Sequence, residues 1–274
     1  MALVIFFAIS LVAALLILPF LLNILRYLGH LQKNYTGRDI PQSMGSVLMP
    51  VYALAVAWAL FTGLLPYGLV LRAAIIVFGF GLAGLADDMF GDDRARGFAG
   101  HFRSVLAHGE ITTGFIKAAA GFLFAMWAVA GLPGFFLFLF WRAALVALSA
   151  NLFNILDLRP GRALKVFFLL SLIYAWLAAS EIGILLLFPC WLALLAYFPY
   201  DLRSYGMLGD AGANILGGLL GLVIVLTAPL WLQSVYMLFL VLIHIITERI
   251  SLTELIAANP VLNYLDMLGR KDWN

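Results

Sequence analysis

Charged residues are scarce in this chain of 274 residues, of which Asp, Glu, Lys and Arg together make up 11%. Apolar residues make up 65%, and the mean hydropathy is +1.06. A water-soluble domain cannot bury that much apolar surface, so the composition excludes a soluble enzyme or binding module. The single cysteine, Cys190, excludes an intramolecular disulfide and lies inside an apolar run, where we expect it to fill the core.

The alternating pattern of a transmembrane β-barrel is also lacking. Apolar runs of about 17 to 22 residues recur instead, each long enough for a helix to cross a bilayer. The first run has no basic segment before it and no evident cleavage site after it, so we expect a retained helix. No linker separates domains, and residues 1–274 are expected to form one integral-membrane domain. We predict an all-α, polytopic transmembrane bundle of about nine helices, near 2–25, 46–64, 68–86, 112–131, 135–154, 163–179, 182–199, 211–228 and 229–247.

Lys and Arg are distributed unevenly between the predicted loops. Of the 16 Lys and Arg residues, all but Arg72 and Arg142 lie in or beside the segments 26–45, 87–111, 155–162, 200–210 and the tail from 248. The positive-inside rule assigns these segments to the cytoplasm and the N-terminus to the outside of a cell membrane. Among the acidic residues only Glu181 falls on the other side. We therefore expect an active or binding surface at the cytoplasmic boundary.

Carboxylates stand at the cytoplasmic ends of two predicted helices. The third helix ends in "GLADD", so Asp87 and Asp88 lie at the membrane boundary, where carboxylates are costly unless a cation needs them. The eighth helix begins in "LGDAG", which puts Asp210 at a helix N-terminus, where exposed N–H groups bind anions. Asp210 is therefore interpreted either as a plain N-cap or as the ligand of a divalent cation that bridges to phosphate.

Amides and a third carboxylate end the fifth predicted helix. In "NLFNILD", the side chains of Asn151, Asn154 and Asp157 are three residues apart and lie on roughly one face. Such a polar face has to turn away from lipid. It serves either to bind substrate or to hydrogen-bond to a neighbouring helix, and both interpretations stay open.

Basic residues accompany these carboxylates on the same side. His244 and Glu248 share a face of the ninth helix, and His244 is suited to bind phosphate when protonated or to transfer a proton. We expect substrate contacts from Glu248, Arg249, Arg103 and Lys117 as well. The alternative interpretations are an interfacial histidine with satisfied hydrogen bonds and basic residues that anchor lipid headgroups.

The chemistry of these residues favours a hard cation and phosphate. Oxygen ligands without a thiolate cluster favour Mg²⁺ or Mn²⁺ over zinc. A hard cation beside basic side chains suits phosphate chemistry, and the surrounding bilayer implies a lipid substrate. We expect no nucleic-acid partner. A transporter is less favoured, because the polar residues gather on one side and we find no internal repeat.

The ordered motifs resemble those of the polyprenyl-phosphate N-acetylhexosamine-1-phosphate transferases, the superfamily of the MraY and WecA types. The motifs are "GLADD", "NLFNILD", "LGDAG" and a histidine near the end of the ninth helix, and the loop "IPQSMGS" resembles the family's "PTMGG" loop. The resemblance covers nearly the whole chain. It implies Mg²⁺-dependent transfer of a sugar-1-phosphate, of the UDP-N-acetylhexosamine type, to undecaprenyl phosphate for cell-envelope glycan synthesis. It also makes a homodimer a possible assembly.

Roles for single residues follow from the same resemblance. Asp87 and Asp88 match the family's paired aspartates near the metal and the lipid phosphate. Asp157 matches the aspartate near the nucleotide, and His244 falls in the region of the histidine motif, so these four are expected to be catalytic. Asp210 matches the metal-binding aspartate, with Asp88 as its implied neighbour at the metal.

One motif departs from the family's pattern. The stretch "DLRPGRA" stands where the family often continues with "DGLDGL". Arg159 and Arg162 add positive charge there, which predicts a substrate with an additional or bulkier phosphate group. The departure indicates a divergent branch. It also leaves open a member that has lost catalysis and binds a lipid phosphate or a nucleotide sugar as a scaffold.

Overall fold

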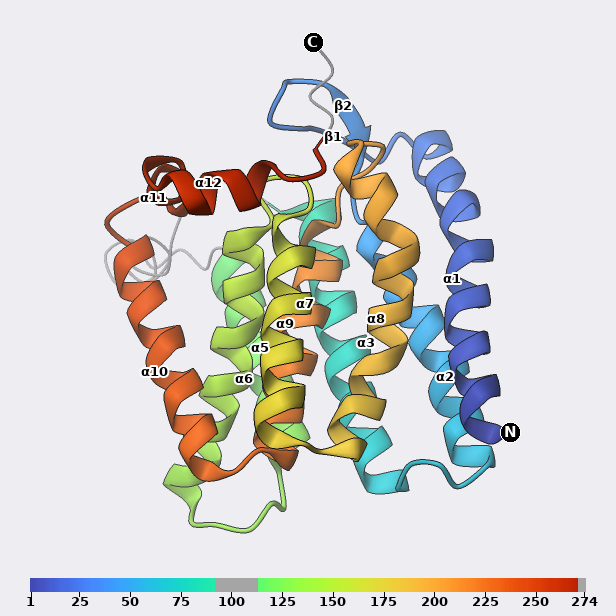
Figure 1. The fold of residues 1–274 in the computed structure, drawn as a ribbon, viewed down its shortest axis with the longest axis vertical. Coiled ribbons are helices and arrows are strands. Elements are labelled where there is room, and N and C mark those ends of the chain that lie inside the picture. Colours follow the sequence, from blue (N-terminus) through green and yellow to red (C-terminus); the bar gives the residue numbers. More distant parts are fainter. Residues whose placement is uncertain (92–112, 271–274) are drawn as a thin grey trace.

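The computed structural model describes residues 1–91 and 113–270, whose regular secondary structure is helical except for one short β-hairpin. In these ranges seven helices are long and apolar enough to cross a membrane. They are α1 (Ala2–Tyr27), η1 with α2 (Met44–Val47 and Leu48–Phe61), α3 (Tyr67–Phe90), α6 (Phe136–Leu156), α8 (Glu181–Leu202), α9 (Gly209–Thr227) and α10 (Leu230–Thr247). Two shorter helices, α5 (Thr113–Val129) and α7 (Arg162–Ala178), run beside them (Figure 1).

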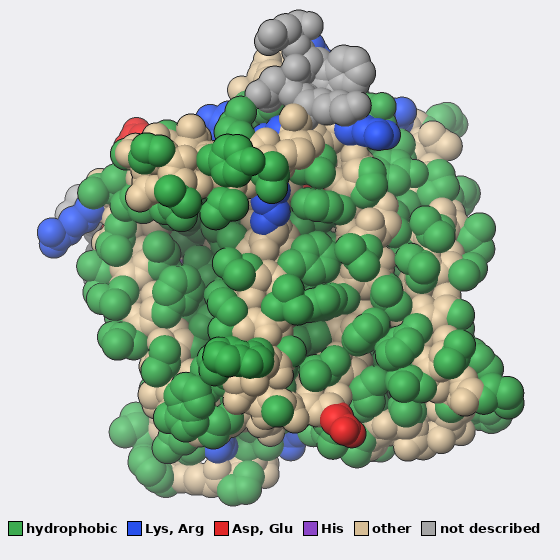
Figure 2. Space-filling view, in the orientation of Figure 1, with side chains coloured by type: hydrophobic (Ala, Val, Ile, Leu, Met, Phe, Trp, Pro, Cys, Tyr) green, Lys and Arg blue, Asp and Glu red, His purple; other side chains and the backbone are tan. Residues whose placement is uncertain are grey.

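The predicted helical architecture is thereby confirmed. Each helix end lies within four residues of its prediction. The largest difference is at α3, which continues to Phe90, so that Asp87 and Asp88 belong to its last turn rather than to the following loop. On the face drawn in Figure 2, apolar side chains cover the flank of the bundle and Lys and Arg side chains gather mainly toward one end. This is the surface expected of a helical bundle in a bilayer.

Helix α9 forms the centre of the bundle. It contacts α3, α6, α7 and α8, and its side chains from Ala211 to Val225 are all buried. A helix that is buried all round has to be apolar or small on every face, and this stretch is, apart from Asn214, whose side chain is hydrogen-bonded. A Cβ on Gly217 would lie 2.2 Å from the backbone oxygen of Ser149 on α6. Glycine at this position therefore lets α6 and α9 pack backbone to backbone.

Short elements cover one end of the bundle, which we call the site end (Figure 1). Strands β1 (Leu31–Lys33) and β2 (Asp39–Pro41) pair antiparallel there, with Gln32 opposite Ile40. Helices α11 (Leu252–Ala258) and α12 (Pro260–Met267) lie across the same end, whereas the N-terminus lies at the opposite end.

The sequence-based description of the tail from residue 248 as a loop is corrected by α11 and α12. The Asn259 side chain caps α12 by accepting hydrogen bonds from the N–H groups of Val261 and Leu262. Pro260 follows as the first helical residue, where its fixed φ favours the helix and its missing N–H costs nothing. These are local start signals for a helix too short to stand out by hydrophobic periodicity.

Substitution of Gly217 by Ala tests the close packing of α6 and α9. The added Cβ has to displace backbone, so we expect the free energy of unfolding in detergent to fall by about 1–3 kcal/mol. Gly68→Ala is the control, because a Cβ there meets nothing within 4 Å. Thermal unfolding should leave this control at or above the wild-type midpoint. Equal midpoints for the two variants would contradict the packing.

Candidate functional site

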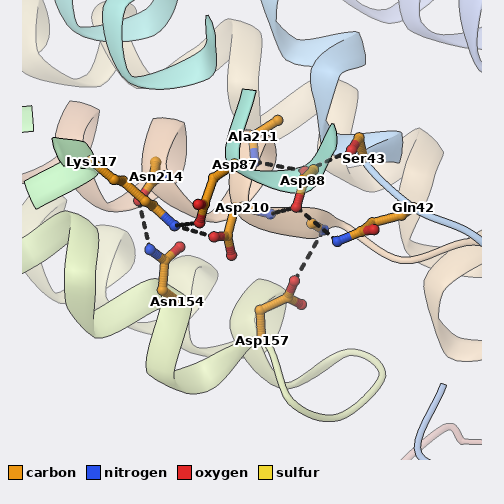
Figure 3. Close-up of polar contacts among 11 residues, drawn as sticks. Gln42, Ser43, Asp87, Asp88, Lys117, Asn154, Asp157, Asp210, Ala211 and Asn214 are labelled. Carbon is orange, nitrogen blue, oxygen red and sulfur yellow. Dashed lines mark hydrogen bonds and ion pairs between the residues drawn. The ribbon is translucent and has the colours of Figure 1, made fainter. Parts of the chain in front are cut away.

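The last turn of α3 aims two adjacent carboxylates at different neighbours. Successive helical residues point about 100° apart, so Asp87 and Asp88 cannot serve the same partner equally. Asp88 faces the N-terminus of α9 and the loop before η1, and Asp87 faces Lys117 on α5 (Figure 3). The pair thus links three separate segments of the chain at the site end.

Both oxygens of the Asp88 carboxylate are fully engaged. Oδ1 accepts hydrogen bonds from Gln42 Nε2 at 2.9 Å and from the Asp210 N–H at 3.0 Å. Oδ2 accepts them from Ser43 Oγ at 2.6 Å and from the Ala211 N–H at 3.3 Å. Two of the four donors are N–H groups of the first turn of α9, where the helix dipole favours an anion. Asp88 is therefore an N-terminal cap for α9 that is supplied by another helix.

The backbone around Asp88 is shaped for this close contact. Gly209, which precedes Asp210, has φ of +74°, and a Cβ on it would lie 2.7 Å from Asp88 Oδ2. Ser43 also has a positive φ, +64°, and is completely buried. Its hydroxyl lies 2.9 Å from Nε2 of His30, so a chain of hydrogen bonds runs from Asp88 through Ser43 to His30. A strained serine that persists in a buried position indicates that its surroundings fix it there.

Lys117 lies between two carboxylates. Its Nζ is 2.9 Å from Asp87 Oδ2 and also forms an ion pair with Asp210 Oδ2 (Figure 3). These three side chains come from α5, α3 and α9 and are each partly buried. An ammonium group among carboxylates at a membrane boundary offsets charges that would otherwise be costly there. We call Asp87, Asp88, Asp157, Asp210 and Lys117 the acidic cluster. Lys117, predicted to contact substrate, is a central member of it.

The end of α6 supplies the third carboxylate. Asp157 caps the C-terminus of α6, and its Oδ2 accepts a hydrogen bond from the Gly209 N–H at 3.1 Å. Burial, reinforced by the charges of Asp201, Asp210 and Asp88, raises the pKa of Asp157 well above its usual value. A single backbone donor does not outweigh that burial. Asp157 is therefore a carboxyl group that retains its proton to a higher pH than an exposed aspartate.

Two amides lie beside the carboxylates. Asn154 donates from Nδ2 to Oδ1 of Asn214 on α9 at 2.8 Å, and Asn154 Oδ1 is buried without a hydrogen-bond partner among the described residues. This contact matches the interpretation of the asparagine face as a link between helices. Asn151, on the same face of α6, is half-buried and takes part in none of the cluster's hydrogen bonds within the described ranges.

Several predicted residues lie apart from this cluster. His244 on α10 contacts the Leu240 carbonyl at 2.7 Å through Nδ1, and its Nε2 is buried with no hydrogen-bond partner in the described part of the chain. Glu248 and Arg249 follow at the end of α10 and are exposed. Within the described residues, His244 therefore takes part in none of the cluster's hydrogen bonds. Arg103 lies outside the described residues.

The two arginines of "DLRPGRA" point to another part of the site end. Arg162 is only 3% exposed, and its Nε and Nη2 bond to the two oxygens of Asp266 on α12. The guanidinium of Arg159 stands 4.7 Å from the ring centre of Tyr35 in the hairpin turn. Neither arginine contacts the acidic cluster directly. Arg162 stays a predicted substrate ligand, and its hydrogen bonds to Asp266 fasten α12 to the bundle.

The cluster fits a divalent cation in part. Within the described ranges, no three His, Cys, Asp or Glu side chains are grouped so as to hold a metal ion. Mg²⁺ often takes only one or two protein carboxylates and completes its shell with water and substrate phosphates. Asp87 and Asp210 converge on one point, at the Lys117 ammonium, so they are the two carboxylates that could hold such an ion. Asp88 suits such an ion less well, because four donors use its acceptor sites.

Sequence reasoning missed several polar partners of the cluster. Gln42 and Ser43 stand in the loop that resembles a family motif, but no spacing rule connected them to Asp88, which lies 45 residues beyond Ser43. Asn214 follows Asp210 by one helical turn, which could have indicated a shared face. Asp201 accepts from the Gly161 N–H at 2.7 Å and gave no local signal of that contact.

Comparison of the chain with protein-family models finds no match, and a search of curated proteins finds none either.

Asparagine at position 88 tests the cap on α9. Its amide NH₂ would face hydrogen-bond donors, so we expect Asp88→Asn to lower the free energy of unfolding by about 2 kcal/mol or more. Asp87→Asn is the neighbouring control, because Lys117 keeps Asp210 as a partner. Thermal unfolding in detergent should rank Asp88→Asn clearly below Asp87→Asn. A reversed order would remove the capping role.

The pH dependence of stability tests the state of Asp157. Because its pKa is raised in the folded protein, ionisation destabilises the fold increasingly as pH rises above the ordinary aspartate pKa of about 4. Asp157→Asn mimics the protonated group and avoids that loss. In EDTA, we expect the thermal unfolding midpoint of the variant, relative to that of the wild type, to rise between pH 4 and pH 8. A relative midpoint that falls over this range would contradict the raised pKa.

Proposed function

We propose that the chain transfers a sugar-1-phosphate from a nucleotide sugar to undecaprenyl phosphate at the cytoplasmic face of a cell membrane. The observation that supports this most is the meeting of Asp87, Asp210 and Lys117, with Asp157 close by, at one end of an apolar bundle. These groups come from α3, α5, α6 and α9. Acidic and basic groups at one membrane boundary suit a reaction between a soluble phosphate ester and a lipid phosphate.

The proposed reaction exchanges one phosphoanhydride (P–O–P) bond for another. An oxygen of the lipid phosphate attacks the phosphorus bonded to the sugar, and the bond to the nucleoside monophosphate breaks. Mg²⁺ or Mn²⁺, held by Asp210 and Asp87, would neutralise charge on the diphosphate. The Lys117 ammonium lies within reach of the same groups and would offset charge that develops on phosphoryl oxygens.

The other polar residues have supporting roles in this proposal. Asp88 orients the first turn of α9 and thereby Asp210. Asp157 holds the N–H of Gly209 in the same turn. The Asn154–Asn214 pair fixes the ends of α6 and α9 relative to each other. The role first expected for His244 in proton transfer is not needed, because the lipid phosphate is largely ionised near pH 7.

Topology in the membrane is part of the same proposal. We propose that α5 and α7 also span the bilayer, giving nine crossings with the N-terminus outside and the site end in the cytoplasm. The gathering of Lys and Arg in the segments of the site end supports this orientation. The partners would be the bilayer, undecaprenyl phosphate and a nucleotide sugar of the UDP-N-acetylhexosamine type, with a homodimer as the possible assembly.

One observation favours a second candidate. Lys117 already neutralises Asp87 and Asp210, and no larger acidic group in the described residues holds a metal. A chain of this kind that has lost catalysis would bind a lipid phosphate or a nucleotide sugar without turning it over. Binding with no turnover is the property that separates this scaffold from the transferase.

Replacement of Asp210 by Asn tests the transferase. In lipid nanodiscs with Mg²⁺, undecaprenyl phosphate and labelled UDP-N-acetylhexosamines, we expect the wild type to form labelled lipid and Asp210→Asn to lose at least a hundredfold in rate. Glu254→Gln is the control, since Glu254 is exposed on α11 at the same end. It should keep the wild-type rate. A wild type that binds the nucleotide sugar but forms no product supports the scaffold, and unchanged turnover in Asp210→Asn removes the assignment of the metal.

A further inference from the structure

A second polar region of the site end forms a cavity of about 440 Å³. The hairpin turn, the loop after α6, the start of α7 and helix α12 surround it, and its lining includes Tyr35, Arg159, Arg162, Asn263 and Arg270. Its volume lies within the range of small-molecule sites. The residues of the acidic cluster do not line it.

Positive charge exceeds negative charge in the wall of this cavity. Arg162 and Arg270 both pair with Asp266, at 2.8 Å and 2.6 Å, and both are nearly fully buried. Burial would raise the pKa of Asp266, but the hydrogen bonds and charges of the two guanidinium groups outweigh it and lower that pKa. Within the lining, one carboxylate therefore serves two buried cations; the buried carboxyl of Asp201, behind the lining, also interacts with Arg270 and offsets part of their charge. A remaining surplus of buried charge is unfavourable unless an anion completes it.

One buried nitrogen of Arg270 lacks a hydrogen bond among the described residues, whereas all three side-chain nitrogens of Arg162 donate one. Arg270 Nε donates to the Pro160 carbonyl at 2.9 Å, whereas its buried Nη2, although 2.6 Å from Asp266, has no hydrogen bond of good geometry within the described residues. Arg270 Nη2 and Asp266 therefore attract each other by charge but do not form a well-aligned hydrogen bond. Lys165 binds the last carbonyls of α12 at 2.8 Å and 3.0 Å, and so adds a further positive charge behind the wall.

Arg159 is the member best placed to receive a ligand. It is half-buried, its guanidinium lies over the Tyr35 ring, and no described carboxylate forms an ion pair with it. Stacking on an aromatic face fixes the plane of a guanidinium and leaves its N–H groups free at the edge. An edge of this kind matches two oxygens of a phosphate group.

We infer that this cavity binds a phosphate-bearing ligand, with Arg159 as the principal contact and the Arg162–Asp266–Arg270 group as its positively charged wall. Two sources share this chemistry, a soluble diphosphate and the headgroup of an anionic lipid. The apolar side chains of Ile256 and Met267 also line the cavity and would contact the less polar part of either ligand.

The cavity is close to the acidic cluster along the chain. Arg159 follows Asp157 by two residues, so their α-carbons are at most about 7–8 Å apart. If the proposed transferase function holds, a nucleotide sugar could reach from the cluster into this cavity. Only this connection between cluster and cavity rests on the proposed function. The excess of positive charge in the cavity wall does not depend on that function.

Binding of inorganic pyrophosphate tests the soluble source. The full chain in phosphatidylcholine nanodiscs is titrated in EDTA, so that no metal contributes at the cluster. We expect Arg159→Gln to weaken binding at least tenfold. Arg203→Gln, a control exposed at the same end, should stay within twofold of wild type. Asp210→Asn should also keep binding, whereas it should lose turnover.

Phosphatidylglycerol in the nanodiscs tests the lipid source. If the cavity takes a headgroup, native mass spectrometry will detect bound phosphatidylglycerol on the wild type and at least tenfold less on Arg159→Gln. The inference is overturned if neither probe binds in a way that depends on Arg159, or if Asp210→Asn abolishes binding as Arg159→Gln does. Absence of turnover in the wild type, with Arg159-dependent binding present, contradicts the transferase alone.

Discussion

The four hydrogen bonds to Asp88 hold the site end together. A single carboxylate from α3 receives two backbone N–H groups of α9 and two side chains of the loop before η1. Hydrogen bonds to a charged group contribute more than those between neutral groups, about 1.5–3 kcal/mol each. The contacts that the first turn of α9 makes with the cluster depend on this arrangement. Asp210 meets Lys117, and Gly209 meets Asp157, because the first turn of α9 is fixed in place.

The interior of the bundle explains why polar chemistry is confined to one end. Beyond Asn214, helix α9 is apolar or small and buried as far as Val225, and its glycines admit α6 at backbone distance. A polar group in that layer would have to be paired without help from water. At the site end, loops and the short helices α11 and α12 supply donors, acceptors and charges instead. Function is therefore expected where the helices end rather than along a path between them.

Much of this could be predicted from sequence, because apolar runs and helix-end motifs are local. The boundaries of the helices and the presence of Asp87, Asp157 and Asp210 at one end follow from run lengths and loop charges. The partners could not be predicted in the same way. Arg162 was expected to bind substrate, and nothing in the sequence indicated its pairing with Asp266, which lies 104 residues further along the chain. Pairs that are distant in sequence are decided by tertiary packing, which a single sequence does not reveal.

Electron paramagnetic resonance of Mn²⁺ bound to the full chain in nanodiscs tests the central claim most directly. The claim is that Asp87 and Asp210 hold a divalent cation against the diphosphate of a nucleotide sugar. With UDP-N-acetylglucosamine present, the account predicts a protein-bound Mn²⁺ signal with phosphorus hyperfine coupling, lost in Asp210→Asn. Mn²⁺ that stays free in solution, or that binds equally well without Asp210, would contradict it.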